Sequence, residues 1–195
     1  MKINRIQPAD FEQIYELFLS AQIKKQDLSR TLIPKAGFYE YHLNEQDFRN
    51  RLRDNSFSLS LKNNHGKILA YLIAYSLNSC STKTILSESH VDPVLNRLKY
   101  ANKDLVYSDQ FFVSPSLPIF IAGRLADAWD YIIQGENIPG VVAAIPQKPW
   151  KNEASTRFVL CRGFSRKEFL KSQEIELGLF VKPYCKVGDD ISIKL

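Results

Sequence analysis

The sequence predicts a mixed α/β fold, and three observations support that prediction. Apolar segments with the composition of strands are interleaved with segments whose apolar residues recur at helical spacing. The clearest junction is a strand over 105–113, a break rich in Ser and Pro over 114–118, and a helix from Ile121 onward. No linker or repeat divides the 195 residues, so we expect one domain, in which 78–103 is an insertion.

The N-terminal segment predicts a strand over 2–6 and then a helix. Asp10 is suited to cap this helix, with Gln13 three residues later as in a capping box. The segment over 32–41 has no clear period and several aromatic residues, so we interpret it as a loop that either binds substrate or plugs the core. In the helix that begins near Asp10, the residues expected to face the core are Phe11, Ile14, Tyr15, Phe18 and Ala21.

A second helix, rich in charged residues, is predicted after Asn44, because Asn is a favoured capping residue. Phe48 and Leu52 are its inward residues. Strands over 57–61 and 68–77 follow. The turn between them reads Asn-Asn-His-Gly, and these residues accept positive φ, which is typical of a β-hairpin.

The second half of the chain continues the alternation of helices and strands. A continuous apolar run over 140–145 is typical of a buried strand. A helix over 152–162 ends before Gly163, which suits the position after a helix, and 166–170 and 175–181 close the chain as a β-hairpin. The helix after the central break carries apolar residues at Ile121, Leu125, Ala128, Trp129 and Ile132.

Charge and composition narrow the class of protein. The chain has 26 Lys and Arg against 21 Asp and Glu, a net charge of +5, which favours an anionic partner such as a nucleotide-bearing co-substrate. The sequence contains no basic stripe with interleaved aromatic residues, so nucleic-acid binding is not predicted. The longest apolar run, 68–75, is shorter than the about 20 residues of a membrane span, and the N-terminus lacks the apolar core of a signal peptide. Three cysteines without metal-like spacing indicate reduced thiols in a cytoplasmic protein and no metal site.

Two local motifs point to a family. Residues 112–115 read Phe-Val-Ser-Pro, and residues 152–158 read Asn-Glu-Ala-Ser-Thr-Arg-Phe, followed by Gly-Phe at 163–164. With the early Ile-Gln-Pro-Ala-Asp over 6–10 and the predicted order of elements, they resemble the GNAT superfamily of acyl-CoA-dependent N-acyltransferases. In that family the fourth strand ends in V-x-P and a later helix carries N-E-A-S-x-R-F and G-F. The resemblance covers nearly the whole chain.

The resemblance implies a GNAT-like fold, a mixed and mostly antiparallel central sheet flanked by helices. It implies transfer of an acetyl group from acetyl-CoA to a primary amine of a small molecule or a peptide, and it leaves a homodimer open. The backbone of the family's fourth strand holds the thioester, which puts Phe111 and Val113 at the co-substrate. The helix-start asparagine of the family contacts the pantetheine arm or orders the loop before the helix, which implies one of these roles for Asn152. A plain N-cap is the alternative, and it is compatible with either role.

The sequence departs from the family at the loop that holds the diphosphate of CoA. The family pattern Arg/Gln-x-x-Gly-x-Gly/Ala falls on 118–123, where only the last glycine, Gly123, is present. Pro118 has no N–H to donate, and bulky side chains replace the other glycine. We therefore expect a weaker or differently seated diphosphate, with Arg124 or Ser116 supplying part of the lost contact.

A second departure concerns the acid that protonates the leaving thiolate. The family often has a tyrosine at the position of Val159, which cannot donate a proton. Cys161 points elsewhere at helical spacing, and we expect it to be a thiol packed in the core. Tyr184, beyond the last strand, is a further candidate that the sequence cannot place.

Asp109 is the candidate general base, because some family members carry a carboxylate four residues before the valine of V-x-P. Strand alternation predicts that it shares a face with Phe111 and Val113. A carboxylate on such an apolar face holds a proton more readily than in water, which suits a base. The alternative is a carboxylate at the strand edge that is solvated or paired with a lysine.

The other titratable residues are weaker candidates. His42 follows the aromatic loop and could border the acceptor pocket, His65 is expected to be exposed in the hairpin turn, and His90 has no readable context. Lys148, Trp150 and Lys151 either contact the adenosine phosphates or lie in a solvated loop. The departures from the family also support a rival interpretation, a non-catalytic GNAT-like module that binds another ligand or a partner.

Overall fold

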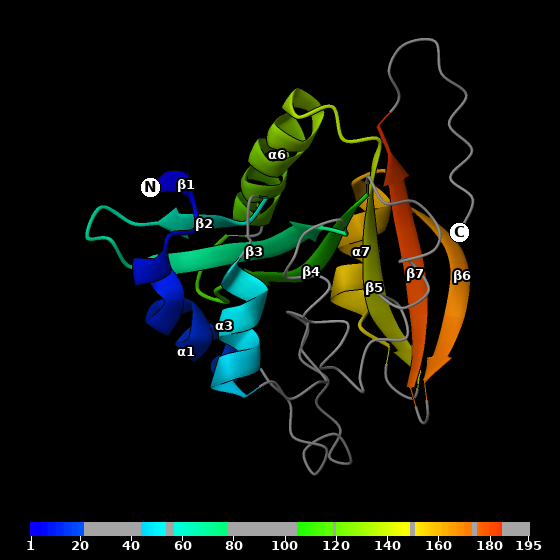
Figure 1. Ribbon diagram of the computed structural model, residues 1–195, viewed down its shortest axis with the longest axis horizontal. Coiled ribbons are helices and arrows are strands. Elements are labelled where there is room, and N and C mark those ends of the chain that lie inside the picture. Colours follow the sequence, from blue (N-terminus) through cyan, green and yellow to red (C-terminus); the bar gives the residue numbers. More distant parts are fainter. Residues whose placement is uncertain are drawn as a thin grey trace.

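A computed structural model describes the following residues: 1–21, 44–53, 57–77, 105–118, 120–148, 151–172 and 175–184. Within them, seven strands form one sheet in the order β1-β2-β3-β4-β5-β7-β6 (Figure 1). All neighbouring strands are antiparallel except β4 and β5, which are parallel. The predicted aromatic loop, the predicted insertion, His42 and His90 lie outside the described residues.

Four helices accompany the sheet in the part of the chain that the structure describes, so the predicted mixed, mostly antiparallel sheet flanked by helices is confirmed. The strands are β1 (Lys2–Arg5), β2 (Leu59–Lys62), β3 (Ile68–Ser76), β4 (Val106–Val113), β5 (Gly140–Lys148), β6 (Ser165–Ser172) and β7 (Ile175–Pro183). The helices are α1 (Phe11–Ala21), α3 (Glu45–Arg53), α6 (Phe120–Gly135) and α7 (Glu153–Cys161), with a short 3-10 turn, η1 (Pro8–Asp10), before α1.

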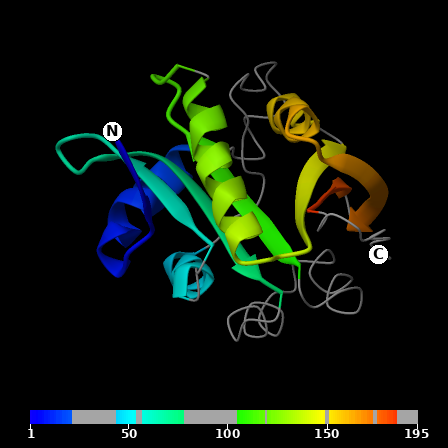
Figure 2. The ribbon, with the colours of Figure 1, turned by 90° about the horizontal axis from the view of Figure 1, so that it is seen from above.

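The helices cover both faces of the sheet (Figures 1 and 2). On one face, Phe18 of α1 and Phe48 of α3 pack with Tyr71 of β3, and all three are fully buried. On the other face, Trp129 of α6 and Val159 of α7 pack with apolar strand residues. Because successive side chains of a strand point to opposite faces, β3 and β4 contribute to both clusters.

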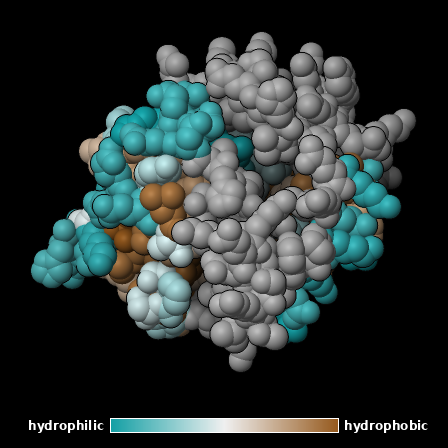
Figure 3. Space-filling model, turned by 90° about the horizontal axis from the view of Figure 1, so that it is seen from below, coloured by the Kyte–Doolittle hydropathy of each residue, from teal (hydrophilic) through white to brown (hydrophobic). Residues whose placement is uncertain are grey.

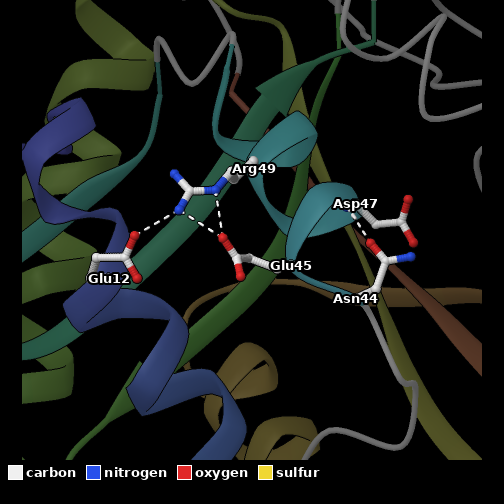
Figure 4. A network of polar contacts seen from close by, with 5 residues as sticks. All are labelled: Glu12, Asn44, Glu45, Asp47 and Arg49. Carbon is white, nitrogen blue, oxygen red and sulfur yellow. Dashed lines mark hydrogen bonds and ion pairs between the residues drawn. The ribbon is translucent and has the colours of Figure 1, made fainter.

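An arginine joins the two helices on the first face (Figure 4). Arg49 of α3 donates to Glu12 of α1 at 2.6 Å and to Glu45 of its own helix at 2.8 Å. Asn44 caps α3 as the sequence predicts, since its Oδ1 accepts the backbone N–H of Asp47 at 2.8 Å. These exposed contacts orient α3 on α1, while the buried aromatic residues beneath them supply most of the stabilisation.

The predicted cap of α1 is wrong in detail. Asp10 accepts the backbone N–H of Gln7 at 3.0 Å and pairs with Lys62 Nζ at 2.5 Å, so it ties the start of the helix to β2. Gln13, the predicted capping partner, instead accepts the backbone N–H of Ile68 at 3.0 Å. The physical reason is that the carboxylate and the amide each find a partner on the sheet, which the local sequence does not reveal.

The glycine predictions are confirmed at two turns. Gly66 in the β2–β3 turn has φ 78° and Gly163 after α7 has φ 84°, a region that disfavours residues with a Cβ. His65 is exposed in the same hairpin turn, as predicted.

The surface on the side of α1 and α3 is mixed: hydrophobic residues show between hydrophilic ones (Figure 3). Leu19 of α1 is one of the exposed apolar residues. Over the described ranges, no helix combines the length and the apolar character that crossing a membrane requires. The same ranges contain no group of three or more His, Cys, Asp or Glu residues placed to hold a metal ion.

A charged cluster connects α6, the end of α7 and β7. The carboxylate of Asp130 accepts hydrogen bonds from Arg162 Nη2 and Lys182 Nζ, each at 2.7 Å, and from the hydroxyl of Tyr184. Burial alone would raise the pKa of Asp130, but these three donors outweigh it and hold the pKa below its usual value. The pKa of Tyr184 is raised, first by burial and then by the hydrogen bond to Asp130.

We expect Tyr184→Phe to lower the free energy of unfolding at pH 7 by about 1.5 to 3 kcal/mol, the usual range for a hydrogen bond to a charged group. Because the pKa of Tyr184 is higher in the folded state, its contribution is complete below the ordinary tyrosine pKa of about 10 and is lost as the pH rises above it. Urea unfolding of both proteins between pH 7 and pH 11 measures this. A stability difference that stays constant or widens across that range would contradict the role of Tyr184.

Candidate functional site

The parallel pairing of β4 and β5 stops midway along both strands. Ser108 and Ala143 are the last paired residues. Beyond them β4 continues to Val113 in a ladder with β3, and β5 continues to Lys148 in a ladder with β7. The two strands therefore diverge at the centre of the sheet, as Figure 1 shows.

Beyond the point of divergence, some backbone groups of β4 have no partner strand among the residues that the structure describes. The N–H of Ser114 donates to the carbonyl of Leu69 at 2.9 Å, which makes this pair a hydrogen-bonded pair of the antiparallel ladder. Because such ladders alternate, the N–H and C=O groups of Phe111 and Val113 point away from β3 and toward the side where β5 has turned off. These are the two residues that the sequence analysis assigns to the co-substrate.

An aromatic pair connects β4 to α7 beside this divergence. The rings of Phe111 and Phe158 stack with their centroids 4.9 Å apart and an interplanar angle of 26°. Both side chains lie on the face of the sheet that α6 and α7 cover. The pair fixes one side of α7 against the segment of β4 whose backbone is open.

A buried polar network fixes the start of α7 to β5. Asn152 caps the helix as predicted, its Oδ1 accepting the N–H of Ser155 at 3.1 Å, and its own N–H donates to the carbonyl of Pro146 at 3.0 Å. Gln147 Nε2 donates to Thr156 Oγ1 at 3.1 Å, and Thr156 Oγ1 donates to the carbonyl of Asn152 at 2.8 Å. Gln147 and Thr156 were not predicted as site residues, because nothing local in the sequence indicates that their side chains meet.

The segment between β4 and α6 is closed by its own hydrogen bonds. The hydroxyls of Ser114 and Ser116 are 2.9 Å apart, and the N–H of Leu117 donates to the carbonyl of Ser114 at 2.9 Å. This turn brings the N-terminus of α6 to the end of β4, which is the position where the family holds a diphosphate. A helix N-terminus there carries a partial positive charge.

The start of α6 fits only part of that task. Pro118 has no N–H, and the N–H of Ile121 donates to the carbonyl of Pro118 at 3.0 Å, so neither offers a donor to a ligand. Phe120 places an apolar ring, 59% exposed, at the first position of the helix. Gly123 does leave open space, since a Cβ added there would meet nothing within 4 Å, and Arg124 is exposed. Among the described residues, the start of α6 therefore offers few backbone donors to a diphosphate, while the space at Gly123 and the exposed Arg124 remain compatible with one.

Asp109 lies on the other face of the sheet from the one predicted. In β4, Ile73 pairs with Gln110 and Ala74 with Ser108, so Asp109 is an extra residue, a β-bulge. The bulge resets the alternation, and the carboxylate meets Arg51 of α3, while Phe111 and Val113 pack on the opposite face. The predicted shared face is wrong because sequence alternation assumes a regular strand.

The pair of Arg51 and Asp109 is the most buried ion pair among the described residues. Arg51 Nη1 is 2.6 Å from both carboxylate oxygens, and the side chains are 4% and 2% exposed. Beside it, Gln110 is 1% exposed and its Oε1 accepts the hydroxyl of Tyr71 at 3.2 Å, while its Nε2 has no hydrogen-bond partner within the described ranges. Arg51 was missed in the sequence, although it lies three residues after Phe48 and thus on the inward side of α3.

The candidates for a proton donor do not gather at the divergence. Tyr184 donates to Asp130, next to the start of β5, at the end of the sheet where β4 and β5 are still paired. Cys161 is exposed at the last position of α7, so the prediction of a packed core thiol is wrong.

Of the residues predicted either to contact the adenosine phosphates or to lie in a solvated loop, Lys148 is the last residue of β5. Its Nζ lies 3.3 Å from Oε2 of Glu176. Trp150 lies outside the described residues.

We expect Arg51→Met to lower the free energy of unfolding by about 3 to 5 kcal/mol, because it leaves a buried carboxylate unpaired. The double variant Arg51→Met, Asp109→Leu should recover most of that loss, since both charges are then removed and apolar volume replaces them. Chemical denaturation of the wild type, both single variants and the double variant measures this. A double variant whose loss equals the sum of the two single losses would show that the two side chains do not interact.

Comparison with solved structures supports the architecture. No protein-family model matches the sequence, and neither does any curated protein. The ribosomal-protein-S18-alanine N-acetyltransferase from Escherichia coli superposes with a TM-score of 0.64 at 11% identity, over 98% of each chain. Arylalkylamine N-acetyltransferase 2 from Aedes aegypti gives a TM-score of 0.62 at 14% identity, over 93% of this chain and 98% of that one. Arabidopsis thaliana Naa50, solved with a bisubstrate analogue that contains CoA, gives 0.60 at 12% identity, over 94% and 98%. The diverging β4 and β5, the strand order and these similarities together establish that the chain has the GNAT fold of the N-acetyltransferases.

Proposed function

We propose that the protein is an N-acyltransferase that transfers an acetyl group from acetyl-CoA to a primary amine, carried by a small molecule or a peptide. The observation that carries this proposal is the divergence of β4 and β5, which leaves the backbone of Phe111 and Val113 without a strand partner in the described residues. The reduced cysteines predicted from the sequence favour a cytoplasmic enzyme.

The reaction exchanges one bond for another. The C–S bond of the thioester breaks and a C–N bond forms. The acceptor nitrogen loses two protons: the ammonium gives one to the general base before it attacks, and the nitrogen gives up a second as the tetrahedral intermediate collapses. The departing thiolate takes up one proton, and the other passes from the base to solvent. In this proposal the N–H of Phe111 donates to the thioester carbonyl oxygen, on which negative charge develops. Val113 and Asn152 hold the pantetheine arm, and Gly123 and Arg124 lie where the diphosphate passes.

Asp109 stays the proposed general base, and its ion pair with Arg51 constrains that role. The guanidinium supplies positive charge close to the carboxylate, so a proton transferred to Asp109 would weaken the pair. The carboxylate lies one residue from Gln110 and two from Phe111 along β4, on the face that α3 covers. An acceptor amine would therefore approach from the α1 and α3 side, opposite to α6 and α7.

A second candidate function is a non-catalytic GNAT-like module. It is favoured by Pro118 and by the occupied N–H of Ile121, which reduce the donors available to a diphosphate, and by Val159, which cannot act as an acid. Calorimetric titration with CoA and acetyl-CoA separates the two functions. Saturable binding with a dissociation constant in the micromolar range, about −8 kcal/mol, supports the enzyme, and acetyl transfer to a panel of amines then follows. No binding up to about millimolar ligand, some 4 kcal/mol weaker, would favour the module.

We expect Asp109→Asn to lower the rate of acetyl transfer by about 10²- to 10⁴-fold, the usual contribution of a general base, with little change in CoA affinity. The measurement is kcat and KM across pH, on protein whose folding is checked by denaturation. Arg51→Lys, which keeps a positive charge beside the carboxylate, is the matched control. An unchanged rate in Asp109→Asn would remove it as the base.

We expect Gly123→Trp to weaken acetyl-CoA binding by about tenfold or more, because the indole would fill the open space beside the start of α6. Gly135→Trp is the matched control, since Gly135 ends the same helix and also has nothing within 4 Å of a Cβ. Calorimetry on both variants is the test. Equal effects of the two substitutions would mean that acetyl-CoA does not pass Gly123.

A further inference from the structure

We infer that the protein recognises its acyl donor through the acyl-pantetheine arm, and that a diphosphate contributes little to binding. This inference rests on the proposed function and specifies which part of the acyl donor the site recognises. The shared chemistry is a thioester of pantetheine. Such a thioester occurs at the end of CoA and at the end of a phosphopantetheine group on a carrier protein.

The first observation is that the site for the arm is built. The backbone groups of Phe111 and Val113 point to the side where β5 has diverged, and hydrogen bonding to backbone recognises amides such as those of pantetheine. Two independent sets of contacts fix α7 beside this segment: the stack of Phe158 on Phe111 and the network of Gln147, Thr156 and Asn152. A site that is fixed in this way binds an extended arm without reorganising.

The second observation is that the start of α6 offers few backbone donors to an anion. An anion site at a helix N-terminus needs free N–H groups directed at the ligand. Pro118 has none, and the N–H of Ile121 is bonded to the carbonyl of Pro118 at 3.0 Å. The exposed ring of Phe120 adds an apolar surface where a diphosphate would require polar contacts. Phe120 instead suits an apolar or protein surface.

The two observations together separate the recognition of the arm from the recognition of its anionic end. In a site that binds both the pantetheine arm and the diphosphate, removing the nucleotide end from the ligand costs most of the affinity. In this protein the affinity should depend on the thioester and the two amides of pantetheine. The chemical consequence is that the nucleotide end of the donor is replaceable.

The test compares acetyl-CoA with acetyl-pantetheine, which has the same arm and thioester and no phosphate, by calorimetry on the full chain at moderate salt. We expect the two dissociation constants to agree within about threefold. An acetyl-CoA that binds about tenfold tighter or more would overturn the inference and leave the proposed function intact. No binding of either ligand up to about millimolar concentration would overturn the inference and the proposed function together.

Substitution at Pro118 tests the cause. Pro118→Ala restores an N–H at the start of α6 and should raise the affinity for acetyl-CoA several-fold, with no change for acetyl-pantetheine. Pro115→Ala, another exposed proline of the same segment, is the matched control and should change neither affinity. A Pro118→Ala variant that gains no affinity for acetyl-CoA, or gains equally for both ligands, would contradict the role assigned to Pro118.

A third ligand separates the two sources of the arm. An acyl carrier protein loaded with acetyl-phosphopantetheine should bind more tightly than acetyl-pantetheine if the surface at Phe120 receives a protein, and with equal affinity if the donor is a free thioester. Both results support recognition of the arm. A loaded carrier protein that fails to bind while acetyl-CoA binds tightly would contradict it.

Discussion

The divergence of β4 and β5 is the constraint on which the rest of the molecule depends. Within the described residues, a parallel pair that separates after Ser108 and Ala143 leaves one side of each strand without a ladder partner, and buried backbone groups need partners. Each strand therefore relies on its other neighbour, β3 for β4 and β7 for β5. The sheet holds together through these outer ladders, and the open side becomes available for a ligand.

Beyond the short paired segment of β4 and β5, side chains of α7 join the two halves of the sheet. Between β4 and α7 the contact is the aromatic stack of Phe111 and Phe158, and between β5 and α7 it is the network around Gln147. At the paired end of the strands, the carboxylate of Asp130 in α6 accepts hydrogen bonds from Arg162 just after α7, Lys182 of β7 and Tyr184 just after β7. Hydrogen bonds lie at both ends of α7, at Thr156 near its start and at Arg162 after its last residue. These bonds hold the helix in one position beside the backbone of Phe111 and Val113.

The buried pair of Arg51 and Asp109 shows how the bulge in β4 determines which side chains lie on each face of the sheet. An extra residue turns the carboxylate toward α3 and shifts the following residues by one position. Gln110 and Phe111 thereby point to opposite faces, one toward α1 and α3 and one toward α6 and α7. A buried ion pair contributes little net stability compared with apolar packing, so its value here is the fixed position of the bulge.

The sequence by itself determined the elements, because caps, turns and apolar periodicity are local. Asn44, Gly66 and Gly163 act where they were predicted, and the central strand, turn and helix follow the local pattern. Only the tertiary structure decided which groups meet: the side of the sheet that Asp109 occupies, its partner Arg51, and the partner of Tyr184. These depend on a bulge and on contacts between residues far apart in the chain, which side-chain alternation within one strand does not encode.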